Sequence, residues 1–133
     1  RILTPHPGEF RRLVSCEQNA TREQLETSAN DLAQQIGAVL VLKGHRSLIT
    51  DGQRQEHNTT GNPGMAKGGS GDVLTGVIAA LLAQGLAPFE AAWLGCHVHG
   101  RAGDLAAEAF GQIAMTASDL VQSLSAAWCE QVS

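Results

Sequence analysis

The most informative stretch of this sequence is residues 62–74, which read NPGMAKGGSGDVL. Its four glycines allow backbone conformations that side chains forbid, and they let a ligand approach the main chain closely. The apolar residues that follow predict a helix, and the first turn of a helix presents unpaired N–H groups and positive dipole density. Residues 62–74 therefore predict a loop that binds an anion at the start of a helix.

Asp72 stands at the beginning of this predicted helix. A carboxylate beside a bound phosphate is repelled, so it needs a second task, such as taking a proton from an attacking hydroxyl group or holding a metal ion. The alternative is that Asp72 merely caps the helix. The local sequence leaves both interpretations open.

Lys67 and Ser70 lie in the same stretch. Lys67 could neutralise a phosphate or only keep an exposed loop soluble. Ser70 could cap the helix, and because nothing near it in the sequence resembles a base with an orienting acid, we do not expect a nucleophilic serine. The stretch is not a Walker P-loop, since Lys67 precedes the glycines instead of following them.

The composition is that of one domain or part of one. The chain has 133 residues, 43% of them hydrophobic, with three Phe, two Trp and no Tyr, so its core must consist mostly of Ala, Leu, Val and Ile. The formal net charge of −4, without a cluster of Lys or Arg, gives no electrostatic footprint for nucleic acid or an anionic membrane surface. We therefore expect small-molecule ligands, and neither nucleic acid nor membrane as a partner.

The three cysteines, Cys16, Cys96 and Cys129, are widely spaced and contain no CxxC pair. Neither a disulfide framework nor a zinc site is indicated, which predicts a reducing compartment. No apolar run approaches the roughly 20 residues that span a bilayer. Together these features predict a cytoplasmic protein.

The first part of the chain alternates strand and helix signals. Residues 2–4 are typical of the end of a strand, and a short helix is predicted over residues 9–14. A longer amphipathic helix is predicted to begin after Thr21 as its N-cap and to end at Gly37. Residues 39–42, Val-Leu-Val-Leu, are typical of a strand buried on both faces in a parallel sheet.

The middle of the chain predicts a hairpin and then two helical segments. Residues 47–58 indicate a hairpin, because Asp51-Gly52 is a strong two-residue turn signal. Residues 73–82 predict a helix that is apolar over much of its circumference, which we expect to be buried. Residues 89–109 predict a second, Ala-rich helix or helix pair.

A last helix is predicted after Thr116 or Ser118, with one shared face formed by Leu120, Val121, Leu124 and Trp128. The order of strand, helix, strand, hairpin and helices predicts a layered α/β domain with at least one buried parallel strand. Ligands in such folds bind at the carboxyl ends of strands.

Polar residues follow both predicted strands, so they are expected near the same rim. Lys43 and Gly44 could receive a nucleotide, or Lys43 could be a solvent-exposed residue at a strand end. His6, between two prolines, could contact a substrate or belong only to the turn. Glu9 is expected to cap the following helix, with a water-mediated metal contact as the alternative.

His97 and His99 alternate in an apolar stretch, which could suggest metal ligands. On a helix, however, these two side chains point to different sides, and no carboxylate or third ligand is placed to join them. Packing or solvent exposure is the preferred interpretation.

Three motifs in order, residues 4–9 (TPHPGE), 41–44 (VLKG) and 61–76 (GNPGMAKGGSGDVLTG), strongly resemble the ADP- or ATP-dependent NAD(P)H-hydrate dehydratases of the ribokinase-like superfamily. The resemblance covers essentially residues 1–133. It implies a three-layer αβα sandwich, of which this chain would be the C-terminal half, since family domains are roughly twice as long. An open sheet edge would then be covered by the missing half or by other copies of the chain.

The resemblance implies that hydrated NADH or NADPH is converted back to NAD(P)H at the expense of ADP or ATP with Mg²⁺. Asp72 would act on the ring hydroxyl, the N–H groups of Gly69, Ser70 and Gly71 would hold the transferring phosphoryl group, and His6 would contact the hydrated cofactor. The implied nucleotide site comprises Lys43, Gly44, His45, Arg46, Ser47, Asn62, Gly64 and Gly71. A different ribokinase-like kinase and a nucleotide-binding module without catalysis remain as alternatives.

Overall fold

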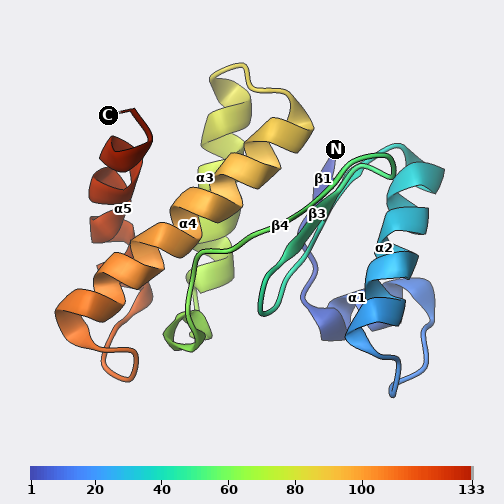
Figure 1. Ribbon diagram of the computed structural model, residues 1–133, viewed down its shortest axis with the longest axis horizontal. Helices are drawn as coiled ribbons and strands as arrows, with labels where there is room; N and C mark the ends of the chain where they lie inside the picture. Colours follow the sequence, from blue (N-terminus) through green and yellow to red (C-terminus); the bar gives the residue numbers. More distant parts are fainter. Residues whose placement is uncertain (133) are drawn as a thin grey trace.

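The computed structural model of the chain describes residues 1–132 (Figure 1). A four-stranded sheet in the order β1-β2-β3-β4 has β1 parallel to β2 and the other neighbours antiparallel. Its strands are β1 (Ile2–Leu3), β2 (Val39–Leu42), β3 (Leu48–Thr50) and β4 (Gln55–His57). The helices are α1 (Pro7–Val14), α2 (Arg22–Ile36), the short 3₁₀ helix η1 (Pro63–Met65), α3 (Ser70–Ala83), α4 (Pro88–Phe110) and α5 (Ala117–Val132).

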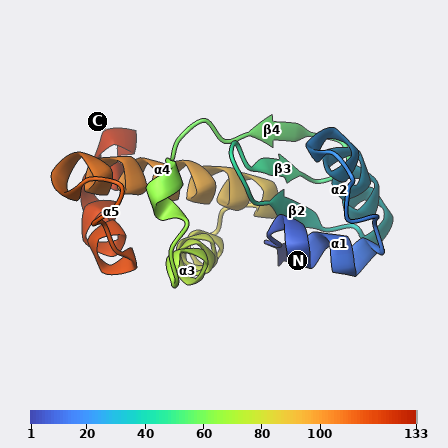
Figure 2. The same cartoon turned by 90° about the horizontal axis from the view of Figure 1, so that it is seen from below.

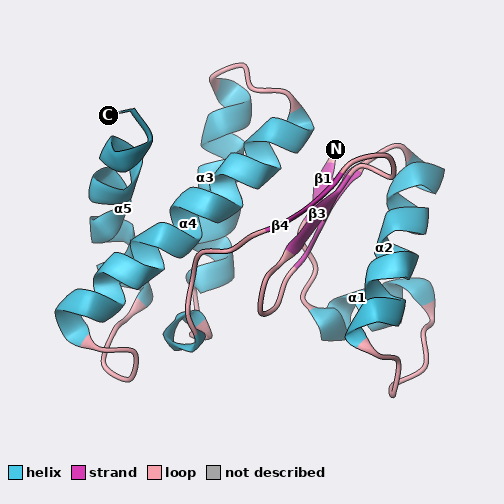
Figure 3. Cartoon of the chain, viewed as in Figure 1, coloured by secondary structure: helices cyan, strands magenta, loops and turns pink. Residues whose placement is uncertain are grey.

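The elements form three layers (Figures 2 and 3). Helices α1 and α2 cover one face of the sheet, whereas α3 and α4 lie toward the other face and α5 packs outside them. Among residues 1–132, no helix is both long and apolar enough to cross a membrane. The arrangement of helices on both faces of a sheet confirms the predicted layered α/β architecture.

Each face of the sheet carries its own apolar core because side chains alternate along a strand. Val39, Val41 and Ile49 pack with residues of α3 and α4, among them Leu74 and Ile78. Leu40, Leu42 and Leu48 pack instead with residues of α1 and α2, among them Phe10, Leu25 and Ala29. The prediction that residues 39–42 are buried on both faces is confirmed, although the sheet is mixed rather than purely parallel.

The helix ends on the first side of the sheet follow from local hydrogen bonds. Thr21 caps α2, since its Oγ1 accepts the N–H of Gln24 at 3.2 Å, and Gly37 ends the helix with a φ of 63°. Helix α1 begins at Pro7, two residues before the predicted start at Glu9. The reason is that the His6 side chain caps it, with Nδ1 accepting the N–H of Glu9 at 3.1 Å.

The hairpin lies where the sequence predicts it, but the prediction of a two-residue turn was wrong. Because Thr50 pairs with Gln55, the connection has the four residues 51–54. The Asp51 carboxylate accepts the N–H groups of Gln53 and Arg54 at 2.9 and 2.7 Å, and Arg54 Nε donates to it as well. These contacts stabilise a longer turn than the Asp-Gly pair predicts.

The helices of the second side decide one alternative and correct one prediction. Residues 88–110 form one continuous helix, the first of the two predicted alternatives. Helix α3 buries one face, with Leu74, Ile78 and Leu81 inside, whereas Leu82 is 38% exposed, so the prediction of a largely buried helix was wrong.

Helix α5 begins after Thr116, whose Oγ1 accepts the N–H of Asp119 at 3.2 Å. Leu120 on this helix is buried, and Leu124 and Trp128 pack beside it against α4. Val121 is 49% exposed and does not share the buried face, which corrects that part of the prediction.

Candidate functional site

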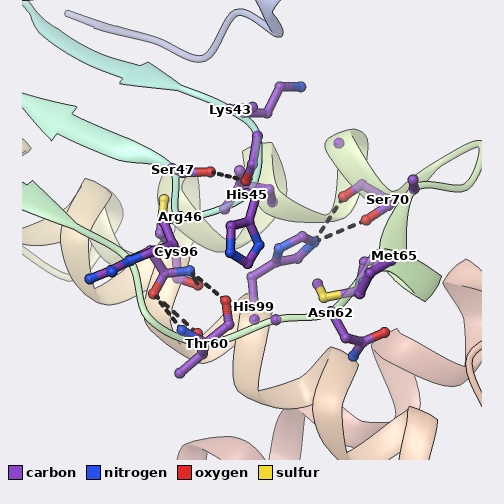
Figure 4. Close-up of a pocket in the computed structure, with 18 of the residues that line it drawn as sticks. Lys43, His45, Arg46, Ser47, Thr60, Asn62, Met65, Ser70, Cys96 and His99 are labelled. Carbon is purple, nitrogen blue, oxygen red and sulfur yellow. Dashed lines mark hydrogen bonds between the residues drawn. The ribbon is translucent and has the colours of Figure 1, made fainter. Parts of the chain in front are cut away.

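A cavity of about 630 Å³ opens where β2 ends and α3 begins (Figure 4). Its walls come from the turn before α1, the segment after β2, the loop around η1, the start of α3 and the middle of α4. The predicted site residues among its lining are His6, Lys43, Gly44, His45, Arg46, Ser47, Asn62, Ser70 and Gly71. Chain segments separated by many residues thus meet at one cavity, as the strand-end argument predicted.

One wall of the cavity is suited to bind an anion. A Cβ built on Gly71 would lie 3.1 Å from Lys43 Nζ, so this ammonium group lies beside the first turn of α3. The N–H of Ser70 already donates to the carbonyl of Lys67 at 3.2 Å. The predicted donors were the N–H groups of Gly69, Ser70 and Gly71, and that of Ser70 is thus already engaged. The first-turn N–H groups of Gly71 and Asp72, which an α-helix cannot satisfy internally, are the donors that this end of the helix can offer.

Arg22 fixes the backbone from which Lys43 projects. Its guanidinium donates to the carbonyls of Leu42 and Lys43, each at 2.9 Å, and to Glu26 at 3.0 Å. A Cβ on Gly44 would lie 2.9 Å from Arg22 Nη1, so a side chain there would collide with the guanidinium. Sequence reasoning missed Arg22, although an arginine in the first turn of a helix opposes the helix dipole and is therefore a signal that it has another task.

His6 both caps α1 and lines the cavity. Its N–H donates to Glu9 Oε1 at 3.0 Å while its Nδ1 accepts from Glu9, so the two residues form a capping box. The hydrogen bond from the His6 N–H is the main cause that lowers the pKa of the Glu9 carboxyl. The prediction that Glu9 caps the helix is confirmed, and the His6 ring remains 54% exposed beside the cavity.

The glycine-rich loop is anchored on both sides by amide and carboxylate groups. Asn62 Oδ1 accepts the N–H of Gly64 at 3.0 Å, and its Nδ2 donates to Asp104 at 2.9 Å. Asp104, which sequence reasoning missed, also accepts the N–H of Gly61 at 3.1 Å. Gly64 is buried behind the cavity wall, where a Cβ would lie 2.6 Å from the Gln112 carbonyl oxygen. It therefore serves packing and does not line the cavity.

His99 lines the cavity from α4 and is only 9% exposed. Its Nε2 lies 3.0 Å from the Ser70 carbonyl oxygen and 3.4 Å from Ser70 Oγ. His97 lies elsewhere on the helix, stacked on Trp93, so the two histidines do point to different sides. The sequence did not reveal that His99 would meet the start of α3. Beside it in the lining, burial raises the pKa of the Cys96 thiol to about 12.

Of the remaining predicted residues, Lys67 and Arg46 belong to the lining of the cavity, whereas Gly69 and Asp72 do not. Asp72 is exposed in the first turn of α3, next to Gly71 but outside the lining, and Gly69 precedes the helix with a φ of 90°. Lys67 lines the cavity and donates to the Ile113 carbonyl at 2.6 Å. Arg46 has a φ of 57°, in the left-handed region that residues other than glycine seldom adopt; Ser15, at the end of α1, has a similar φ of 55°.

The family model of NAD(P)H-hydrate dehydratase matches residues 1–126. The chain belongs to the NAD(P)H-hydrate dehydratase family. The bifunctional NAD(P)H-hydrate repair enzyme Nnr of Moorella thermoacetica is 52% identical over 125 residues, which are 92% of this chain and 23% of that relative.

Two solved structures extend the comparison. The ADP/ATP-dependent NAD(P)H-hydrate dehydratase of Bacillus subtilis, co-crystallised with ATP and Mg²⁺, superposes with a TM-score of 0.90 and 34% identity, covering 97% of this chain and 48% of that one. A ribokinase-like superfamily protein of Enterococcus faecalis superposes with a TM-score of 0.74 and 35% identity, covering 92% and 42%. This dehydratase-family chain thus has the ribokinase-like fold and spans about half the length of these structures, which confirms the resemblance predicted from its motifs.

Proposed function

We propose that the polypeptide containing this chain dehydrates hydrated NADH or NADPH back to NAD(P)H, using ADP or ATP as the phosphoryl donor. The observation that carries the proposal is the meeting of Lys43 Nζ with the first turn of α3 at Gly71, on the wall of the cavity. A cation and helix N–H groups that converge on one point are suited to hold a phosphoryl group during transfer. Family membership supports the hydrated cofactor as the acceptor.

Loss of the hydroxyl group from the hydrated ring requires activation, because hydroxide is a poor leaving group. The hydroxyl oxygen of the ring would attack the terminal phosphorus of the nucleotide while Asp72 takes the proton of this hydroxyl. The nucleotide, shortened by one phosphate, would leave. The phosphorylated ring would then expel phosphate with the help of the lone pair on the ring nitrogen. Loss of a proton from the neighbouring ring carbon would restore the double bond of NAD(P)H.

The other residues would bind and orient. Lys43 would neutralise charge on the transferring phosphoryl group, and the N–H groups of Gly71 and Asp72 would donate hydrogen bonds to it. The segment from Lys43 to Ser47 would contact the nucleotide. His6, exposed at the cavity edge, would contact the hydrated cofactor.

Mg²⁺ fits this arrangement as a partner of the nucleotide. Within residues 1–132 no group of three His, Cys, Asp or Glu side chains could hold a metal ion. Mg²⁺ commonly takes one or two carboxylates and otherwise waters and substrate phosphates, so this site would need few protein ligands. When bound, Mg²⁺ would neutralise charge on the phosphates.

We also propose that a further part of the polypeptide, or a second copy of the chain, covers the outer edge of β1. This strand pairs with β2 on one side only, and an uncovered strand edge favours association. Measurement of the molar mass of the chain in solution tests this, since a monomer that melts cooperatively would contradict it.

We place the enzyme in the cytoplasm, because its proposed substrate and nucleotide are metabolites of the cell interior.

The decisive experiment incubates the full-length polypeptide with hydrated NADH, Mg²⁺ and either ADP or ATP. Recovery of the NADH absorbance with one donor or both is expected. Absence of recovery with either donor would contradict the proposal. Phosphorylation of a hydroxymethyl-pyrimidine, a thiazole or a sugar would then identify a ribokinase-like kinase, while nucleotide binding without turnover would identify a binding module.

A further inference from the structure

A buried histidine stands behind the anion-binding turn and has no role in the reaction as described so far. His99 donates from α4 toward α3, with its Nε2 3.0 Å from the carbonyl oxygen of Ser70. Figure 4 shows the ring directed at Ser70, with Met65 and His45 on either side of the space around it. The contact joins two helices at the point where the proposed phosphoryl site is formed.

The geometry determines which nitrogen of this ring carries the proton. A carbonyl oxygen can only accept a hydrogen bond, so Nε2 must be protonated. Burial is the largest influence on the pKa of His99 and lowers it; the hydrogen bond to the Ser70 carbonyl raises it, and the positive charge of Lys43 lowers it. The net shift of the pKa is downward, which favours the neutral ring with an unprotonated Nδ1. The same tautomer prevents Nε2 from taking the proton of Ser70 Oγ at 3.4 Å, which agrees with the expectation that Ser70 is not a nucleophile.

The start of α3 needs such a contact because its own cap is weak. Gly69 occupies the N-cap position and makes no side-chain hydrogen bond to the helix. The neighbouring glycines leave this backbone conformationally free. Ser70 is held instead from two sides, by its N–H donating to the Lys67 carbonyl and by its own carbonyl accepting from His99.

We propose that His99 is a positioning residue of the dehydratase site: by donating to the Ser70 carbonyl, it sets the direction of the Gly71 and Asp72 N–H groups and of the Asp72 side chain. The inference rests on the proposed function, since it states how that site is aligned. It makes His99 act through Ser70, without a contact to the reacting atoms.

Two substitutions separate this role from a contact between Nδ1 and a ligand. His99→Gln keeps an amide donor near the position of Nε2, whereas His99→Asn places its amide near Nδ1 and cannot reach Ser70. In the full-length polypeptide we expect H99Q to retain kcat within about threefold and H99N to lower it roughly 10- to 100-fold, with a smaller change in the KM for the nucleotide, because a misplacement of about 1 Å costs this much. His97→Asn, on the same helix but stacked on Trp93, is the matched control and should leave both constants unchanged.

A measurement that does not depend on turnover accompanies the kinetics. Nitrogen-15 NMR of the histidine side chains should show one ring, absent in H99Q, with a protonated Nε2 and an unprotonated Nδ1. The proposal is overturned if Nδ1 carries the proton, if H99N and H99Q have equal kcat, or if H99N is the more active of the two. If H99N does not fold, loss of kcat in a folded H99Q would still overturn it. Absence of dehydratase activity in the unsubstituted protein would contradict the proposed function, whereas the NMR signature would still test the His99 contact by itself.

Discussion

Substitution of Gly100 by Ala tests how closely the loop before η1 packs on α4. Gly100 is buried, and a Cβ there would overlap Thr60 Oγ1 and lie 2.7 Å from the Thr60 carbonyl carbon. Thr60 cannot yield easily, because its Oγ1 donates to the His97 carbonyl at 2.9 Å and Asn58 donates to the Cys96 carbonyl at 3.1 Å. The added methyl group must therefore push the loop away from the helix.

The magnitude follows from three effects. Overpacking of a filled interior costs about 1–3 kcal/mol. Each hydrogen bond lost between the loop and α4 costs about 1 kcal/mol more. Replacement of Gly by Ala inside a helix regains about 1 kcal/mol. We expect Gly100→Ala to lower the free energy of unfolding by about 2–3 kcal/mol, since the steric effect exceeds the gain in helix propensity.

Urea unfolding followed by circular dichroism measures this change, and Gly76→Ala is the matched control. Gly76 is an exposed residue inside α3, where a Cβ would meet nothing within 4 Å. Its substitution should raise the free energy of unfolding by up to about 1 kcal/mol. If Gly100→Ala is as stable as the unsubstituted protein, the close packing of Thr60 on Gly100 is refuted.

Three further predictions concern the site. Asp72→Asn should lower kcat by roughly 10²- to 10⁴-fold and leave the calorimetric affinity for the nucleotide nearly unchanged; a large loss of affinity would instead assign Asp72 to binding. Arg22→Lys cannot reproduce the paired hydrogen bonds to the Leu42 and Lys43 carbonyls, so the free energy of unfolding should fall by about 1–2 kcal/mol. The affinity for the nucleotide should fall as well. An unchanged affinity in calorimetry would show that Arg22 does not position Lys43. Burial lowers the pKa of His99 below its usual value of about 6.5, so the unfolded chain protonates this imidazole at a higher pH than the folded chain does. The free energy of unfolding should therefore fall as the pH is lowered below about 6.5, and it should fall less steeply in H99Q. Urea unfolding repeated from about pH 7 to about pH 5 measures this.

The elements with strong local signals were predictable from the sequence. The Val-Leu-Val-Leu strand, the Thr21 cap and the Gly37 helix end depend on properties of a few adjacent residues, and all three are present. The same holds for Lys43 and His6, because residues that follow neighbouring parallel strands must meet at one edge of the sheet.

The contacts that complete the site could not be predicted, because they join distant segments. Arg22, which donates to the carbonyl of Lys43 at the end of β2, precedes Lys43 by 21 residues. His99 follows its partner Ser70 by 29 residues. Neither pair has a local spacing rule that would reveal it. The Asp51-Gly52 turn failed for another reason, since the Asp51 carboxylate accepts two backbone N–H groups and a statistical turn preference does not include that competition.

The apolar interior is divided into separate clusters, one on each face of the sheet and a third between α4 and α5, and this division has a consequence for how unfolding can be observed. Both tryptophans, Trp93 and Trp128, belong to the helices α4 and α5, so intrinsic fluorescence reports on one layer of the molecule. Circular dichroism records the helices of both layers. Coincident fluorescence and dichroism transitions would show that the sheet couples the two layers into one cooperative unit, and separate transitions would show that they unfold independently.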